Sequence, residues 1–291
     1  MTRPLCIAGI AILILLGGRG AAAEVRVGVA AETLQLPARV PLAGYSRRKG
    51  KPSLGVHDPV RIRALVFDDG RTAAALVSCE VLIIDESLAA AVRRRLAAHG
   101  LWRLQMVLAA THTHSGPGAY GARFLEKISM GHFDPAVFEE MVARIVRSIQ
   151  RAHEAMAPAR LAYQRGVTQG FVANRVDSGG LLEQDVTVVA FYHERETPVA
   201  VLVGFAAHPT TLGAWNMALS GDYPGVLMRE VERRLPDTTC LFFAGAVGDQ
   251  APIKQAPPPN LLVGGQGGAF EPAQRLGQAL ADHVVGLLAP P

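Results

Sequence analysis

Short apolar runs separated by polar turn residues recur along the chain and set the expected secondary structure. Such runs predict β-strands, because strands are short, rich in β-branched residues and bounded by turn residues. Two of them flank Asp68-Asp69-Gly70-Arg71, and an Asp-Gly pair between β-rich runs is a strong hairpin signal. The predicted strands span residues 25–30, 60–67, 72–78, 104–110, 186–192, 199–206 and 239–243.

Apolar residues at spacings of three and four predict helices between these strands. The clearest helix begins at Asp134-Pro135, an N-cap residue followed by proline at the first helical position, and continues at least to Ile149. Other helices are predicted over residues 86–98, 222–235 and 271–288, and residues 257–268 are predicted to be a long irregular loop. Because hairpins and crossovers are interspersed, we expect a single α/β domain with a mixed β-sheet core flanked by helices.

The first 23 residues have the pattern of a signal peptide. Arg3 provides a positive start, the residues from Leu5 to Leu16 are an apolar core, and Ala21-Ala22-Ala23 provides a cleavage site before Glu24. The apolar run is too short to span a bilayer comfortably, although an uncleaved anchor is an alternative. We therefore expect a periplasmic or secreted protein whose mature domain spans residues 24–291.

Composition and charge narrow the expected partners. The chain is 49% hydrophobic and 19% charged, which is typical of a folded protein, and its net charge is only +4. A short basic run, Arg47-Arg48-Lys49 and Lys51, is predicted to be a solvated loop, and no basic stripe accompanies it, so we expect no nucleic-acid partner. Cys79 and Cys240 lie in apolar segments, which predicts buried free thiols, while an oxidising compartment also permits a disulfide.

Histidines follow two of the predicted strands and indicate a metal site. His112 and His114 come directly after the strand at 104–110, and residues two apart in an extended segment point to the same side. His208 follows the strand at 199–206. Neutral imidazoles suit a borderline metal such as zinc, and strand ends of α/β folds are where ligand clefts form. Buried histidines without a metal are the structural alternative.

Acidic and basic residues near other strand ends are further candidates. Asp249 either binds a metal or orients a histidine, or it simply forms a turn. Asp222 begins a predicted helix, where an N-cap role is at least as strong as a ligand role. Arg175 precedes another strand, and an arginine in a water-poor site can stabilise a developing oxyanion, although surface arginines are common.

Taken in order, these segments resemble the N-terminal catalytic domain of the neutral, non-lysosomal ceramidases. The most specific segment is Thr111-His112-Thr113-His114-Ser115-Gly116-Pro117-Gly118. The others are Pro41-Leu42-Ala43-Gly44-Tyr45, Gly55-Val56-His57-Asp58-Pro59, Ser78-Cys79-Glu80, Asn174-Arg175, His208-Pro209-Thr210, Ser220-Gly221-Asp222 and Gly248-Asp249. The resemblance runs from about Val27 to the C-terminal helix.

The resemblance implies a zinc-dependent hydrolase that cleaves the amide of ceramide to sphingosine and a fatty acid. It implies that His112 and His208 are zinc ligands, that His114 lies in the active site and that Arg175 contacts the reacting amide or its oxyanion. We take Asp249 as a further candidate ligand, with Glu80 and Asp222 as alternatives. An amphiphilic lipid substrate also implies transient contact with a membrane surface.

The sequence departs from the family at two points. The family motif Gly-Asp-Val-Ser-Pro-Asn is replaced by Gly248-Asp249-Gln250-Ala251-Pro252-Ile253, so Ala251 occupies the position of the serine taken to be catalytic. The family's remaining zinc ligands, a glutamate and a tyrosine, and its C-terminal β-domain come from family sequence that follows the region matched by this chain. We therefore expect zinc-activated water to attack the carbonyl, because zinc lowers the pKa of bound water to about 7. The alternatives are a hydrolase of another envelope amide or ester and a catalytically silent metal- or lipid-binding homologue.

Overall fold

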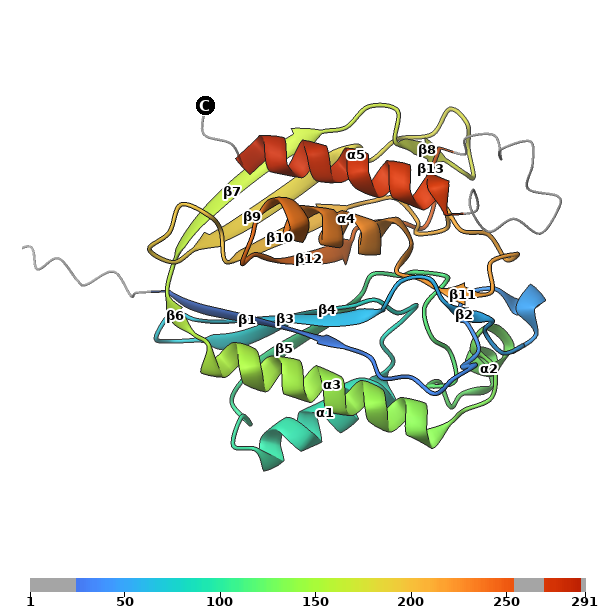
Figure 1. Ribbon diagram of the computed structural model, residues 1–291, viewed down its shortest axis with the longest axis horizontal. Helices are drawn as coiled ribbons and strands as arrows, with labels where there is room; N and C mark the ends of the chain where they lie inside the picture. Colours follow the sequence, from blue (N-terminus) through green and yellow to red (C-terminus); the bar gives the residue numbers. More distant parts are fainter. Residues whose placement is uncertain (1–24, 254–269, 289–291) are drawn as a thin grey trace, which may run out of the picture.

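Two β-sheets lie face to face, and each carries helices on its outer face (Figure 1). The structure is a computed structural model that describes residues 25–253 and 270–288. The predicted signal peptide at residues 1–23 and the predicted loop at residues 257–268 lie outside the described residues. The α/β class with mixed sheets flanked by helices is confirmed, and its strands divide over two main sheets.

The first sheet has the strand order β5-β4-β3-β1-β6. Its strands are β1 (Arg26–Thr33), β3 (Arg61–Asp68), β4 (Ala73–Cys79), β5 (Gln105–Ala110) and β6 (Ala157–Pro158). The predicted hairpin is confirmed, because β3 pairs antiparallel with β4 and the turn ends face each other at Asp68 and Ala73. Gly70 adopts a φ of 78° in this turn, a conformation that favours glycine.

Two helices cover the outer face of this sheet. Helix α1 (Glu86–Ala98) makes the crossover between the parallel strands β4 and β5, and the side chain of Asp85 caps it by accepting from the Leu88 amide. Helix α3 (Pro135–Glu154) packs on β1 and β3. Its predicted apolar face is confirmed as buried and comprises Val137, Met141, Val142, Ile145, Val146 and Ile149.

The second sheet has the order β12-β10-β9-β7. It contains β7 (Arg160–Val167), β9 (Asp185–Tyr192), β10 (Ala200–Phe205) and β12 (Thr239–Ala244). Helix α4 (Asp222–Arg234) makes the crossover between the parallel strands β10 and β12, and α5 (Glu271–Leu288) packs beside it. The edge strand β7 was not predicted from the sequence, because most of its side chains are exposed and no alternation of apolar residues marks it.

The two sheets share a core between them. Val27 and Leu65 project from the first sheet against Phe191, Ala200 and Leu241 of the second, and all five are buried. Separate apolar clusters lie between each sheet and its own helices. Cys79 and Cys240 are both buried and free, which confirms the prediction of free thiols and excludes a disulfide between them in this structure. Within the described ranges, no helix has the length and hydropathy needed to cross a membrane.

A buried ion-pair cluster joins the two layers. Arg63 on β3 is fully buried and donates to Glu80, just after β4, and from Nε to Oε1 of Glu232 on α4 at 2.8 Å. Burial alone lowers the pKa of Arg63, but the Glu80 and Glu232 carboxylates outweigh burial and raise it. Arg63 therefore stays charged and ties β3 to the helix of the other layer.

Several short elements gather at one end of the molecule, around β2, β11, β8, β13 and α2 in Figure 1. They form two small ladders, one of β2 (Gly55–Val56) with β11 (Ala218–Leu219) and one of β8 (Val172–Asn174) with β13 (Gln250–Pro252). The 3-10 helix η1 (Ser46–Arg48) and α2 (Phe124–Met130) complete this end. The residues that follow β5 and β10 also meet here, which positions the histidines.

Candidate active site

Three histidines converge from the two layers. His112 and His114 follow β5 of the first sheet, and His208 follows β10 of the second. One nitrogen atom from each ring lies within 4.8 Å of the others. The closest pair is Nε2 of His208 and Nε2 of His114, which are 2.9 Å apart. The structure thus brings together the three histidines that the sequence indicated.

Backbone carbonyls orient two of these rings. Nδ1 of His112 lies 2.8 Å from the carbonyl oxygen of Leu82, and Nδ1 of His208 lies 2.9 Å from that of Val247. A carbonyl oxygen can only accept, so each Nδ1 carries the proton and each Nε2 has a lone pair, which in His208 faces Nε2 of His114. Metal-binding histidines are commonly oriented in this way. His112 and His208 therefore present the free nitrogen atoms that a metal ion needs.

His114 has different surroundings. Its Nδ1 is buried and has no hydrogen-bond partner among the described residues. Gly44, with a φ of 104°, lies against this ring, and a Cβ built there would come within 2.6 Å of Cγ of His114. The Tyr45 ring lies 4.9 Å from the His114 ring, centroid to centroid. His114 is thus held closely by packing against Gly44 and Tyr45.

Burial keeps two of these rings, those of His114 and His208, neutral. Burial, followed by the neighbouring His208 and His112, lowers the pKa of His114 to about 3. Burial also lowers the pKa of His208 to about 4, with His112 and Arg175 acting in the same direction. Neutral imidazole is the form that coordinates metals, so the site is ready for a cation at neutral pH.

The backbone at His112 is strained. Its φ is 66°, a conformation that a side-chain-bearing residue rarely adopts, and its amide donates to the Val81 carbonyl at 3.0 Å. Such strain costs of order 1–3 kcal/mol and is concentrated at functional sites. The segment after β5 is therefore not an extended continuation of the strand, although His112 and His114 do converge as expected from their spacing.

Arg175 lies beside the loop that follows β12. Its amide donates to the Asp249 carbonyl at 2.8 Å, and its Nε and Nη2 atoms donate to the Gly248 carbonyl at 2.9 and 2.6 Å. The guanidinium is exposed. Its positive charge contributes a little to the lowered pKa of His208 and slightly opposes the rise in the pKa of Tyr45 that burial causes. Arg175 thus stands near the histidines with its charge available.

Asp249 is held away from the histidine group in this structure. One of its carboxylate oxygens accepts from Nδ2 of Asn174 at 2.8 Å. Among the described residues, only the three histidines have possible ligand atoms that all lie within 4.8 Å of one another. Metal binding by Asp249 therefore requires its side chain to move, and its ligand role stays a prediction.

The other two acidic candidates have structural partners. Asp222 is fully buried with a φ of 55°, and it accepts from the Thr211 hydroxyl, from the Leu212 amide at 3.1 Å and from the Tyr223 amide at 2.7 Å. Burial raises the pKa of this carboxyl, against these hydrogen bonds. Asp222 thereby fixes the loop that follows His208, whereas Glu80 pairs with Arg63.

Ala251 lies on the short ladder beside the site. It pairs with Ala173 of β8, and the carbonyl of the preceding Gln250 accepts from the His208 amide at 2.9 Å. The backbone of this ladder therefore supports His208 directly. The side chain at position 251 is a methyl group, which neither donates nor accepts a proton.

Arg48 supports the site from within the basic run, and the prediction of a solvated loop is wrong for this residue. Arg48 is only 3% exposed, and it donates to the carbonyls of Ala43, His114 and Gly213 at 2.8, 2.5 and 3.3 Å. Burial lowers its pKa to about 10. Arg47, Lys49 and Lys51 are exposed as expected. Nothing in a run of basic residues distinguishes the one that folds inward against a loop far away in sequence.

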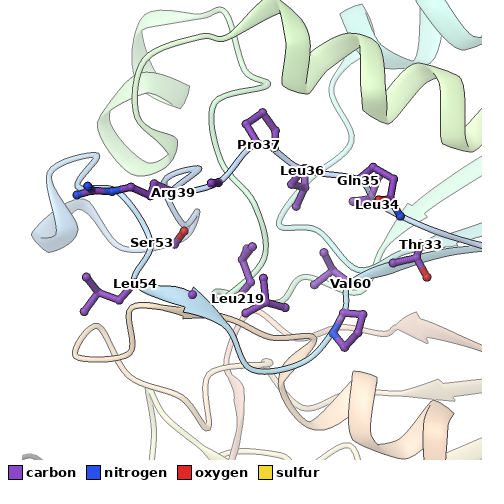
Figure 2. A pocket seen from close by; sticks show the side chains of 14 residues that line it. Thr33, Leu34, Gln35, Leu36, Pro37, Arg39, Ser53, Leu54, Val60 and Leu219 are labelled. Atoms are coloured by element: carbon purple, nitrogen blue, oxygen red, sulfur yellow. The ribbon is translucent and has the colours of Figure 1, made fainter.

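A separate cavity of about 710 Å³ lies beside β2 and β11 (Figure 2). Its wall is largely apolar and includes Leu34, Leu36, Leu54, Val60 and Leu219. None of the three histidines lines it. The cavity is therefore distinct from the candidate active site.

Comparison with known proteins identifies relatives of this chain. A family model described as neutral/alkaline non-lysosomal ceramidase, N-terminal, matches residues 26–252. The chain is 29% identical to the neutral ceramidase of Mycobacterium tuberculosis over 245 residues, which cover 74% of this chain and 38% of that protein. It is 29% identical to the neutral ceramidase of Pseudomonas aeruginosa over 204 residues, which cover 65% of this chain and 30% of that protein.

A solved structure supports the fold. The crystal structure of the Pseudomonas aeruginosa neutral ceramidase matches with a TM-score of 0.80 and 24% identity, covering 91% of this chain and 45% of that chain. A structure described as a ceramidase complexed with C2 matches with a TM-score of 0.79. The chain spans less than half the length of each of these relatives.

Proposed function

Because the chain belongs to the neutral/alkaline non-lysosomal ceramidase family, we propose that it is an exported metal-dependent hydrolase that cleaves ceramide-like amides. The observation that carries this proposal is the convergence of three histidines from two layers of the fold. The curated relatives are neutral ceramidases, which favours ceramide, giving sphingosine and a fatty acid, as the substrate.

His112 and His208 are the proposed metal ligands, because each has an unprotonated Nε2 and a second nitrogen held by a carbonyl. Asp249 is a predicted further ligand, for which its carboxylate must leave Asn174. Two imidazoles and a carboxylate suit zinc. When bound there, zinc would lower the pKa of water to about 7 and so make a nucleophile available at neutral pH.

His114 is the proposed proton carrier. Its ring is neutral in the resting site, because burial and the neighbouring histidines lower its pKa to about 3. Its Nε2 lies 2.9 Å from Nε2 of the proposed ligand His208, so the ring is placed to pass the proton from the attacking water to the leaving amine nitrogen.

Arg175 is proposed to stabilise the oxyanion that forms as the amide carbonyl is attacked. Its guanidinium is held by the Gly248 carbonyl yet remains exposed. One electrostatic donor of this kind is commonly worth about 10²–10³ in rate. Water is the proposed nucleophile because Ala251 has no hydroxyl group.

The decisive experiment measures metal content and ceramide hydrolysis on the same preparation. We expect zinc in the parent protein, loss of both zinc and turnover in His112→Ala and His208→Ala, and a loss of about 10²–10³ in turnover with zinc retained in Arg175→Ala. The matched control is His99→Ala, an exposed histidine at the opposite end of β5, which should change neither. Full activity in His112→Ala, or a preparation without metal that turns over ceramide, would overturn the proposal.

Ala251 favours a second candidate, a metal- or lipid-binding homologue without catalytic activity. Zinc binding without turnover of ceramide, other acyl amides, lipid esters or acylated sugars would support it. Activity gained in Ala251→Ser would then show that the serine-dependent route was lost. Turnover of another acyl amide or ester, but not of ceramide, would keep the hydrolase and change its substrate.

The proposed location outside the cytoplasm has its own test. The apolar segment at residues 1–23 predicts cleavage before Glu24. Mass spectrometry of the protein recovered from the periplasm or medium should find Glu24 as its first residue. Recovery of the intact chain from the membrane fraction would favour the uncleaved anchor.

A further inference from the structure

The end of the molecule that carries the histidines also exposes large apolar side chains. Leu54 and Val56 on or beside β2 are 77% and 63% exposed, Trp215 is 50% exposed, and Phe124, Leu125 and Ile128 on α2 are 77%, 76% and 47% exposed. Single exposed apolar residues are ordinary, but a group on one surface marks an interaction site. We call these six residues the rim patch.

Helix α2 turns its apolar face outward. At 100° per residue, Phe124, Leu125 and Ile128 fall within one third of the helix circumference, whereas the buried Met130 lies on the opposite side. A surface helix normally buries its apolar face against the core. This arrangement leaves three large apolar side chains of one short helix facing solvent.

The segments of the rim patch are joined to one another. The Gly44 amide, just before η1, donates to the Ser129 carbonyl of α2 at 3.0 Å. The Leu54 amide donates to the Met217 carbonyl at 2.8 Å, which ties β2 to the loop that carries Trp215. Figure 1 shows α2, β2 and β11 at the same end of the molecule. The patch is therefore one surface built from three segments.

The same surface is joined to the candidate active site. Arg48, within the segment between Gly44 and β2, donates to the carbonyls of both His114 and Gly213. Trp215 lies seven positions after His208 on the loop that Asp222 fixes. Whatever covers the rim patch therefore lies close to the histidines.

The charge around the rim patch indicates which kind of partner covers it. Exposed basic residues interleave with the apolar ones. They are Arg47, Lys49, Lys51, Lys127 and Arg123, of which Arg123 pairs with the exposed Glu86 at 3.4 Å. The only acid within the segments 46–56, 123–131 and 212–219 is Glu126, whose carboxylate accepts from the Arg123 amide. A symmetric contact between two copies would place these positive charges opposite one another, which is unfavourable. Anionic lipid attracts them, and Trp beside aliphatic side chains is typical of a membrane interface.

We propose that the rim patch docks on an anionic lipid bilayer, with Trp215 and the apolar face of α2 at the headgroup level and the basic residues against the lipid charge. Binding of the rim patch to lipid does not depend on the proposed reaction. Its test therefore contains no ceramide and does not measure turnover.

The two tryptophans of the chain make the test specific. Trp215 lies in the rim patch, whereas Trp102 precedes β5 and so lies at the end of that strand away from His112. Trp102→Phe leaves Trp215 as the only tryptophan, and Trp215→Phe leaves Trp102. Each protein is mixed with vesicles of phosphatidylcholine with about 30% phosphatidylglycerol in which the acyl chains are brominated, since bromine quenches tryptophan only on contact with the bilayer.

We expect quenching of Trp215 and none of Trp102, lost at about 0.5 M salt, because salt screens the basic residues. Lys49→Gln with Lys51→Gln should weaken partitioning about tenfold or more. Phe124→Ser with Leu125→Ser should weaken it similarly, whereas the matched control Leu161→Ser with Tyr163→Ser, two exposed residues on β7, should not.

Several outcomes would overturn the inference. Equal quenching of both tryptophans would mean that the protein meets lipid without using this surface. No quenching of Trp215, together with a concentration-dependent shift of its emission in the absence of vesicles, would mean that a second copy covers the patch. Unchanged Trp215 emission in every mixture would mean that lipid is not the partner, and a protein would then be the occupant to seek.

Discussion

The histidine cluster and the ion-pair cluster around Arg63 both join the two layers of the molecule, but they satisfy their polar groups in different ways. In the ion-pair cluster, the fully buried Arg63 meets the carboxylates of Glu80 and Glu232. In the histidine cluster, the rings turn their nitrogen atoms toward one another, and Nε2 of His208 meets Nε2 of His114 at 2.9 Å. The first cluster pairs opposite charges supplied by the chain itself, whereas the second gathers imidazole nitrogen atoms and contains no acidic partner among the described residues.

This difference separates a structural cluster from a candidate site. Burial raises the pKa of Glu80, but the charges of Arg63 and of Arg229 on α4 oppose that rise. The ion-pair cluster therefore needs no added ligand to balance its charges. The three histidines instead bring three imidazole nitrogen atoms within 4.8 Å of one another, which is a set of ligand atoms that a metal ion can bind. Burial of polar groups alone therefore does not mark a functional site.

The largest effect on stability is expected from Arg63→Ala. Removal of Arg63 leaves Glu80 buried with an uncompensated charge, and breaking a buried pair in this way costs about 3–5 kcal/mol. Urea unfolding followed by circular dichroism measures the change. Arg63→Met combined with Glu80→Met, which removes both charges, should recover part of the loss. A cost below about 1 kcal/mol for Arg63→Ala would show that the cluster is not an energetic link between the layers.

The fold was predictable where local signals were strong. The Asp-Gly turn, the N-cap before Pro135 and the apolar spacing of α3 are local signals, and the hairpin and the helix formed as predicted. The division of the strands over two sheets depends on packing between Val27, Phe191 and other residues distant in sequence. The exposed strand β7 and the short ladders around the site carry no periodic pattern, so they were not predicted.

The candidate site was predictable in its histidines and not in its supporting residues. His112 and His208 follow strand ends, where ligand clefts form in α/β folds. The two-residue spacing also indicated His114, even though the backbone at His112 has a positive φ and is not extended. Arg48 depends on contacts with Gly213, which is 165 positions away in the chain, and no local signal reveals them. The contact between the Asp249 side chain and Asn174 likewise depends on residues far apart in the sequence, because the β8–β13 ladder brings the two together. The roles of these residues remain predictions.

An intermediate effect is expected from acid on the metal-free histidine cluster. The folded pKa values of His208 and His114 are about 4 and about 3, both below the value of about 6.5 expected in the unfolded chain. Between these values the unfolded chain binds more protons, so stability falls as pH decreases below about 6.5 and is fully present above it. After chelation, lowering the pH from 7 to 5 should cost about 2 kcal/mol or more in the free energy of unfolding.

The matched variant for this test is His208→Gln, which removes one of the two titrating rings. Its free energy of unfolding should depend less steeply on pH over the same range. An identical slope in parent and variant would mean that other groups cause the acid sensitivity. A parent protein that gains stability on acidification would contradict the neutral state assigned to the cluster.

The smallest effect is expected from Arg61→Gln, which isolates burial from charge. Arg61 and Arg63 approach the same carboxylate, but the Arg61 side chain is 36% exposed and its Nη1 lies 3.6 Å from Oε2 of Glu232, whereas the Arg63 side chain is 0% exposed. Water solvates Arg61 in both folded and unfolded states, so removing its charge should cost less than about 1 kcal/mol. The same urea titration compares both variants. If Arg61→Gln costs as much as Arg63→Ala, the charge near Glu232 governs stability. Burial of the arginine would then not be the cause of the larger cost.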